Sequence, residues 1–250
     1  MRTYLLEIKY EFLKALRLPA YSLPTLLFPV LFYLFFGVMF GAKQTGSVNM
    51  ATYLVATYGT FGVIGAALFG FGVSVAVERG QGWLEQKRTT PMPIAAYFVS
   101  KLAMAMIFSA IIVTMLFIVG TTVGDVVMPL TTMAKLFGVL VLGSITFCAF
   151  GLALGFLAGP NSAAPIVNLI YLPMAFLSGL WLPIAFLPKP IQEIALWLPP
   201  YHFSQLALRT IGASRGEPIA LNVGAMIVAT LLFGAIAYLG YRRDEGKLYG

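Results

Sequence analysis

The sequence predicts an all-α membrane protein with six transmembrane helices, an N-terminal interfacial amphipathic helix and an outer re-entrant helical segment before the last span. The first observation is composition: the 250 residues are 60% hydrophobic and 10% charged, and their mean hydropathy of +0.89 excludes an ordinary soluble protein. The second is spacing, because apolar runs of about 20 residues alternate with short polar segments. The third is charge. The basic residues behind the net charge of +7 collect between the apolar runs, so they indicate membrane topology rather than nucleic-acid binding.

Residues 1–19 form the predicted interfacial helix. Its apolar positions recur at helical spacing, with charged residues on another face and Pro19 as the stop; the apolar positions are Leu5, Ile8, Phe12 and Leu16, and the charged ones include Glu7, Glu11 and Lys14. Such a helix is expected to lie in the membrane interface, although a charged surface helix has the same pattern. Because charges recur as far as Arg17, no uninterrupted apolar stretch precedes Leu18, and a cleavable signal peptide is not expected.

Six apolar stretches are the predicted spans, and together they make one transmembrane domain over residues 1–250. They are 22–41, 53–77, 99–123, 134–157, 165–182 and 219–241. Two of them carry small residues at regular intervals: Gly59, Gly62, Ala66 and Gly70 in the second, and Gly151, Gly155 and Gly159 around the end of the fourth. Stripes of this kind favour close contact between helices over a cofactor site.

The polar segment, residues 78–98, is the longest polar interruption of the apolar pattern. Glu78, Arg79, Glu85, Lys87, Arg88 and Lys101 cluster in and beside it. Gly80 and Gly82 loosen the backbone, residues 83–90 are long enough for two helical turns, and Pro91 and Pro93 end that short helix and start another. A short rigid helix between two spans suits contact with a second protein, but a solvated loop that only fixes orientation has the same composition.

The outer segment, residues 183–211, is too apolar for a free loop and too rich in proline for one straight span. Its prolines are Pro183, Pro188, Pro190, Pro199 and Pro200. We expect two short helices, around 191–198 and 203–211, that enter the interface with Trp181 and Trp197 as anchors.

Counting basic residues gives the orientation. If both termini are cytoplasmic, the inner segments hold eleven Lys and Arg residues and the outer segments hold Lys43, Lys135, Lys189, Arg209 and Arg215. The excess on the inner side supports this assignment.

Several kinds of chemistry are missing from the sequence. No G-x-x-x-x-G-K-[ST] motif occurs, so the chain is not expected to bind ATP by itself. The lone His202 and the lone Cys148 exclude a histidine cluster, a cysteine-rich metal site and an internal disulfide, and His202 is expected to be an interfacial or packing residue. We expect the spans to hold almost no ionisable groups, which disfavours an ion-coupled transporter.

Two stretches resemble the ABC-2 type transporter permeases. Glu78, Arg79, Gly82, Leu84 and Glu85, followed by Thr90, Pro91 and Met92, are similar to the cytoplasmic loop of that family, and the run from Ser178 to Leu208 is similar to its outer re-entrant segment. The likeness extends over essentially the whole chain. Met92, Pro93, Lys87 and Arg88 depart from the family pattern and leave the exact partner surface open.

The resemblance implies the permease subunit of an ATP-driven exporter in a bacterial or archaeal cytoplasmic membrane. Such a subunit dimerises with a second copy or a paralogue and binds a separate ABC ATPase, which holds the ATP and Mg, while this chain binds no cofactor and no metal. Residues 83–90 would be the coupling helix. The residues implied at the ATPase contact are Glu78, Arg79, Gly82, Trp83, Leu84, Glu85, Lys87, Arg88 and Pro91. Those implied for the re-entrant segment are Trp181, Pro183, Trp197, Pro199, Pro200, Tyr201 and His202.

Two other functions stay open at this point. One is an intramembrane enzyme built on His202 with Ser178 or Ser204, and the other is a membrane scaffold or assembly protein without transport. The aromatic and aliphatic spans favour a lipid-like or amphipathic drug-like substrate, but any lipid-facing helix uses the same residues.

Overall fold

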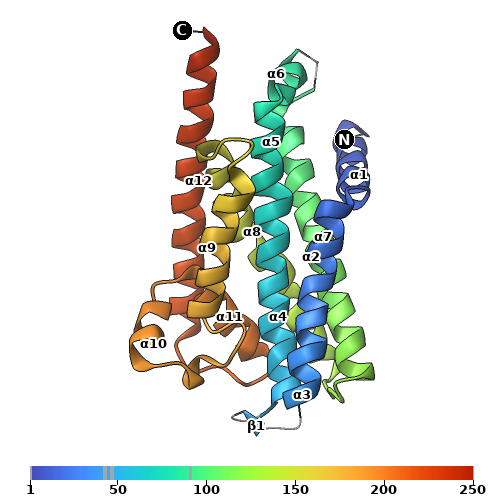
Figure 1. The fold of residues 1–250 in the computed structure, drawn as a ribbon, viewed down its shortest axis with the longest axis vertical. Coiled ribbons are helices and arrows are strands. Elements are labelled where there is room, and N and C mark those ends of the chain that lie inside the picture. The colour runs from blue at the N-terminus through green and yellow to red at the C-terminus, as the bar shows by residue number, and fades with distance from the viewer. Residues whose placement is uncertain (1, 42–43, 46–47, 90–91, 250) are drawn as a thin grey trace.

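The computed structural model describes residues 2–41, 44–45, 48–89 and 92–249 and shows an antiparallel bundle of long helices (Figure 1). The first part of the chain forms α1 (Arg2–Leu16), α2 (Pro19–Phe32), a π-helical turn (Tyr33–Gly37), α3 (Val38–Phe40) and a short hairpin of β1 (Gln44–Thr45) and β2 (Val48–Asn49). Next come α4 (Met50–Ala67), a second π-helical turn (Leu68–Val73), α5 (Ser74–Gly80) and α6 (Trp83–Arg88). The rest forms α7 (Ile94–Thr122), α8 (Leu130–Leu157), α9 (Ala163–Leu177), a 3₁₀ turn (Ile184–Phe186), α10 (Lys189–Ala195), α11 (Pro199–Thr210) and α12 (Ile219–Tyr249).

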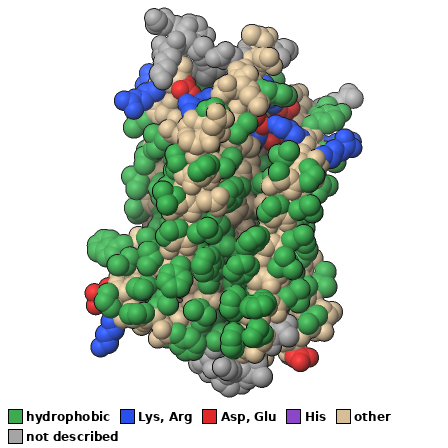
Figure 2. Space-filling model, in the orientation of Figure 1, with side chains coloured by type: hydrophobic (Ala, Val, Ile, Leu, Met, Phe, Trp, Pro, Cys, Tyr) green, Lys and Arg blue, Asp and Glu red, His purple; other side chains and the backbone are tan. Residues whose placement is uncertain are grey.

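Both termini lie at the same end of the bundle. In Figure 1 this terminal end carries α1, α6 and the last turns of α12, whereas the opposite end carries the β hairpin, α10 and α11. Apolar side chains cover the visible face between the two ends, and most of its charged side chains gather near the terminal end (Figure 2). An apolar belt with charged groups beyond it is what a membrane-spanning bundle requires.

Within the described residues, five helices are long and apolar enough to cross a membrane. They are Pro19–Gly37, Met50–Gly80, Ile94–Thr122, Leu130–Leu157 and Ile219–Asp244. The fifth predicted span, 165–182, corresponds to α9, which has 15 residues and a length of about 22 Å against the roughly 30 Å of a hydrocarbon core. The chain is therefore an integral membrane protein with five clear spans and one shorter apolar helix.

The glycines of the second and fourth spans allow these helices to touch backbone to backbone. A Cβ atom built on Gly72 would lie 2.6 Å from the carbonyl oxygen of Gly151, and one built on Gly155 would lie 2.7 Å from that of Gly72. Only a residue without a side chain fits such an approach. Gly59, Gly62 and Gly70 are equally close to side chains of neighbouring helices, whereas Gly159 lies in ordinary contact distance and has no such role.

The helical winding of the first span changes partway along it. Pro24 and Pro29 lie inside α2, and a π-helical turn starts at Tyr33, four residues after Pro29. Proline removes a backbone donor and its ring crowds the preceding turn, so a local change of winding beside it has a physical cause. The buried ring of Tyr33 fills this part of the bundle.

Candidate functional site

The polar segment leaves the bundle at the terminal end, between α5 and α7. α5 ends at Gly80, and Gly82 takes the left-handed conformation, with φ of +76°, that lets the chain turn into α6. The short helix predicted over 83–90 is present but ends at Arg88, and Pro93 precedes the first residue of α7. Pro91 and the side chains of Glu85 and Arg88 lie outside the described part of the structure.

α6 presents one aromatic residue and buries its neighbour. Trp83 is 45% exposed, and Gln81 and Gln86 are exposed beside it, whereas Leu84 packs into the main apolar core. The ammonium group of Lys14, on α1, lies over the Trp83 ring at 5.2 Å from its centroid. Around the start of α6, the accessible side chains that the structure describes therefore include an aromatic ring and two amides.

Glu78 lies inside the protein. One of its carboxylate oxygens accepts from Lys14 and from Lys101, with 2.7 Å to the Lys101 Nζ atom, and the other accepts from the Tyr97 hydroxyl at 2.6 Å. Lys101 is fully buried and also donates to Glu11 on α1 and, at 3.0 Å, to the hydroxyl of Ser74. We call Glu11, Lys14, Ser74, Glu78, Tyr97 and Lys101 the charge cluster; it joins α1, α5 and α7.

The charge cluster is balanced, which explains how it tolerates burial. Two carboxylates, Glu11 and Glu78, face two ammonium groups, Lys14 and Lys101, and the second oxygen of Glu78 accepts from the Tyr97 hydroxyl. Removing one partner of such a group leaves a buried charge uncompensated and typically costs about 3–5 kcal/mol. The cluster therefore holds the three helices in one register.

A second ion pair attaches α6 itself to α1. Lys87 pairs with Glu7, and its ammonium group lies 5.1 Å from the centroid of the Tyr97 ring. Burial, and then the nearby positive charge of Lys101, lower the pKa of Lys87 below its ordinary value. α6 is therefore fixed to α1 as well as to the chain on either side of it.

Arg79 points to the other side of α5. Its guanidinium donates to both carboxylate oxygens of Asp244 on α12, at 2.8 and 3.0 Å, and to the Ala158 carbonyl at 2.7 Å. Consecutive residues, Glu78 and Arg79, thus connect the end of α5 to two different groups of helices. The side chains of Arg79 and Asp244 are 22% and 25% exposed, so solvent weakens this pair relative to the buried one.

Sequence reasoning missed most of the charge cluster. It placed Glu11 and Lys14 on a polar face, counted Lys101 as a loop charge and passed over Ser74 and Tyr97. A signal was present, because Ser74 and Glu78, and likewise Tyr97 and Lys101, are four residues apart and so share one face of an otherwise apolar helix. Two such polar pairs at the ends of consecutive spans predict that the pairs contact each other.

The outer segment is helical at the opposite end of the bundle, as predicted, but its second helix starts earlier. Pro199 and Pro200 occupy the first turn of α11, where a missing N–H costs nothing, instead of preceding the helix. Pro183 is buried and caps the 3₁₀ turn. Trp197 is 88% exposed and free to meet lipid headgroups, whereas Trp181 packs against aromatic rings of the bundle.

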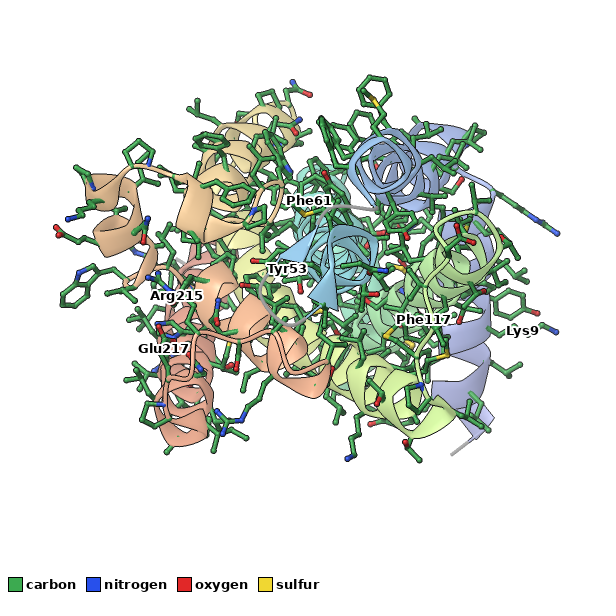
Figure 3. All side chains as sticks on the ribbon, turned by 90° about the horizontal axis from the view of Figure 1, so that it is seen from below. Lys9, Tyr53, Phe61, Phe117, Arg215 and Glu217 are labelled. Atoms are coloured by element: carbon green, nitrogen blue, oxygen red, sulfur yellow. The ribbon has the colours of Figure 1, made fainter. Side chains whose placement is uncertain are left out.

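His202 is buried and both ring nitrogens have partners. Nδ1 lies 2.8 Å from the Asn222 side-chain oxygen and Nε2 lies 2.9 Å from the Leu196 carbonyl, so the ring joins α11 to α12 and to the end of α10. Beside it, the Tyr201 hydroxyl donates to Glu217, and burial followed by this bond raises the pKa of Tyr201 above its ordinary value. Figure 3, seen from the opposite end, shows Glu217 and Arg215 close together at the edge of α12.

The described residues show neither a metal-ligating cluster nor a hydrogen bond between His202 and a serine. Among them, no three His, Cys, Asp or Glu side chains come together in a way that could hold a metal ion. The Ser204 hydroxyl donates to the Tyr201 carbonyl at 2.8 Å, and none of the hydrogen bonds described here joins a serine to His202. The arrangement offers a short helix with an exposed tryptophan and a set of ion pairs between helices.

The sequence was compared with protein families and with known proteins. The profile of the ABC-2 type transporter family matches residues 3–211. The chain is 27% identical over 236 residues to the Bacillus subtilis (strain 168) protein named "Putative transport permease YvfS", covering 94% of this chain and 95% of that protein. It is 26% identical over 174 residues to the Escherichia coli (strain K12) protein named "Probable multidrug ABC transporter permease YbhR", covering 68% of this chain and 47% of that protein. The chain belongs to the ABC-2 type transporter family.

Proposed function

We propose that this chain is the permease subunit of an ATP-driven exporter, coupled to a separate ABC ATPase through α6. The observation that supports this most is α6 itself: a short helix at the terminal end, with Trp83 half exposed and its other side fixed to the bundle. A helix that accepts force from a partner must be both accessible and rigidly attached. Family membership favours a transport subunit over an intramembrane enzyme.

The contact with the ATPase is assigned to the exposed part of the polar segment. Trp83 and Gln86 are accessible, and the contact residues implied by the family resemblance, Gly82, Glu85, Arg88 and Pro91, belong to the same stretch of chain. Leu84, Glu78, Arg79 and Lys87 are assigned a supporting role, because each is held by other parts of the chain. The ATPase can change the conformation of this chain only if it binds two conformations of the chain with different affinity.

The membrane arrangement follows from the same proposal. α9 would complete a sixth crossing with the turns that follow it, which places both termini on one side, and the excess of basic residues assigns that side to the cytoplasm. Two copies, or this chain and a paralogue, would enclose the substrate path. A lipid-like or amphipathic drug-like substrate fits the aromatic lining of the spans, and the multidrug wording in the name of the Escherichia coli relative agrees with that class.

Co-purification tests the proposal directly. The chain is co-expressed with the ABC ATPase encoded beside it, and wild type is compared with Trp83→Ala/Gln86→Ala and with Glu85→Ala/Arg88→Ala. We expect a stable complex with wild type and at least tenfold weaker capture with the variants, roughly the effect of losing one interface anchor. The matched control is Trp197→Ala, an exposed tryptophan at the opposite end, which keeps the complex. Failure of wild type to bind any ABC ATPase contradicts the proposal.

A further inference from the structure

The charge cluster lies at the end of α5, directly before α6, so a displacement of α6 reaches the membrane-spanning helices at this point. Glu78 precedes α6 by five residues, and only Gln81 and Gly82 separate α5 from α6. Its carboxylate is held by Lys101 of α7 and by Lys14 of α1. Any displacement of α6 therefore reaches Glu78 through a very short connection.

α1 receives the same displacement by a separate route. It touches α6 through the Lys87–Glu7 pair and through Lys14, whose ammonium group lies over the Trp83 ring. Lys101 meets the same helix at Glu11, so α1 is held at both the polar segment and α7. α1 ends at Leu16 and α2 begins at Pro19, so α1 leads directly into the first span.

Lys101 is the centre of this arrangement because it is the one member that contacts both carboxylates. Its side chain has no exposed surface, and it donates to Glu11, Glu78 and Ser74. Sliding α1 or α5 along α7 would leave at least one of these charges buried without a partner. Because that cost is high in a dry environment, the three helices resist relative movement.

We propose that Lys101 is a positioning residue that makes α1, α5, α6 and α7 move as one body, so that displacement of α6 by the ATPase is delivered to the first span through α1. The inference rests on the proposed coupling to an ABC ATPase. It assigns a role to Lys101, whose side chain is fully buried and lies outside the surface assigned to the ATPase. Arg79 and Asp244 connect α5 to α12 on the other side and are not part of this body.

The test measures whether α1 and α6 keep their distance while α6 moves. In a Cys148→Ser background, spin labels are placed at Tyr10→Cys on α1 and at Thr89→Cys directly after α6, two exposed positions. A second pair, Thr89→Cys and Trp197→Cys, reports movement of α6 relative to the opposite end, because Trp197 is exposed and lies outside α1, α5, α6 and α7. Labelled chains are diluted with an excess of cysteine-free chain, and the complex with the ATPase is measured without nucleotide and after trapping with ADP and vanadate.

Three variants are compared with wild type. Lys101→Met removes the central charge, and Glu11→Gln/Glu78→Gln/Lys101→Met removes the charge while leaving no buried ion behind, which protects the experiment against simple misfolding. Lys9→Met is the matched control, because Lys9 is an exposed cation on the same α1 helix and points away from the bundle in Figure 3.

With wild type and Lys9→Met, we expect vanadate trapping to change the 89–197 distance and leave the 10–89 distance unchanged. In the two Lys101 variants, the 10–89 distribution should widen about twofold and shift with nucleotide state, because the body is no longer rigid. A 10–89 distance that changes in wild type, or that stays narrow in the triple variant, overturns the inference while the coupling function stands. An 89–197 distance that never responds to nucleotide overturns the coupling function and the inference with it.

Discussion

The hydroxyl of Tyr97 donates a hydrogen bond of 2.6 Å to Glu78, and the ammonium groups of Lys87 and Lys101 lie over its ring at 5.1 and 5.4 Å from the centroid. One buried tyrosine thus satisfies a carboxylate and stabilises two cations. This contact joins the first turn of α7 to the last turns of α5.

Breaking the charge cluster should destabilise the protein strongly. Glu78→Ala leaves Lys101 buried with one carboxylate instead of two and removes the acceptor of Tyr97. We expect the free energy of unfolding to fall by about 3–5 kcal/mol. The measurement is reversible denaturation in detergent, and Lys9→Met, at an exposed site, should stay within about 0.5 kcal/mol of wild type.

Close packing between the second and fourth spans should not tolerate a side chain at Gly72. Gly72→Val would place its Cβ 2.6 Å from the Gly151 carbonyl oxygen, so the two helices must separate. Overpacking of this kind costs about 1–3 kcal/mol, and more where backbone rather than side chain must move. We expect loss of the monodisperse peak in size-exclusion chromatography. Gly138→Val serves as the control, because nothing lies within 4 Å of its Cβ position; equal behaviour of the two variants would contradict the packing.

His202 and Asn222 should act as a unit. Either His202→Ala or Asn222→Ala removes the 2.8 Å contact between α11 and α12 and leaves a buried polar group unsatisfied, at a cost of about 1–3 kcal/mol. The double variant should cost clearly less than the sum, because the two residues share one interaction. Hydrogen exchange in α11 provides the local measurement, and strict additivity would show that the contact is not formed.

Replacing Arg79 should lower the stability of the protein more than replacing its partner Asp244. Arg79→Ala removes two hydrogen bonds to Asp244 and one to the Ala158 carbonyl, whereas Asp244→Ala leaves the last of these in place. Since both side chains are partly exposed, we expect losses of about 1–2 kcal/mol and below about 1 kcal/mol, respectively. Thermal unfolding followed by tryptophan fluorescence compares the two, and an equal loss would mean that the carbonyl contact contributes nothing.

The sequence by itself determined the features that depend on local composition. Long apolar runs, the proline-rich outer segment and the charged stretch around Glu78 each follow from the solvent that a segment must face, and the helices of the structure fall in those places. The glycine stripes also predicted close contacts between helices. Such properties belong to one segment at a time, so they can be inferred before any neighbour is known.

Only the tertiary structure decided which charges are buried and which residues meet. Lys101 looks like a loop charge until Glu11, from the far end of the sequence, is packed against it. The sequence likewise suggested a full-length fifth span, whereas α9 has 15 residues. The physical reason is that a buried ion is tolerated only when distant helices bring its partners within hydrogen-bonding distance, and that pairing is a property of the assembled bundle rather than of any one segment.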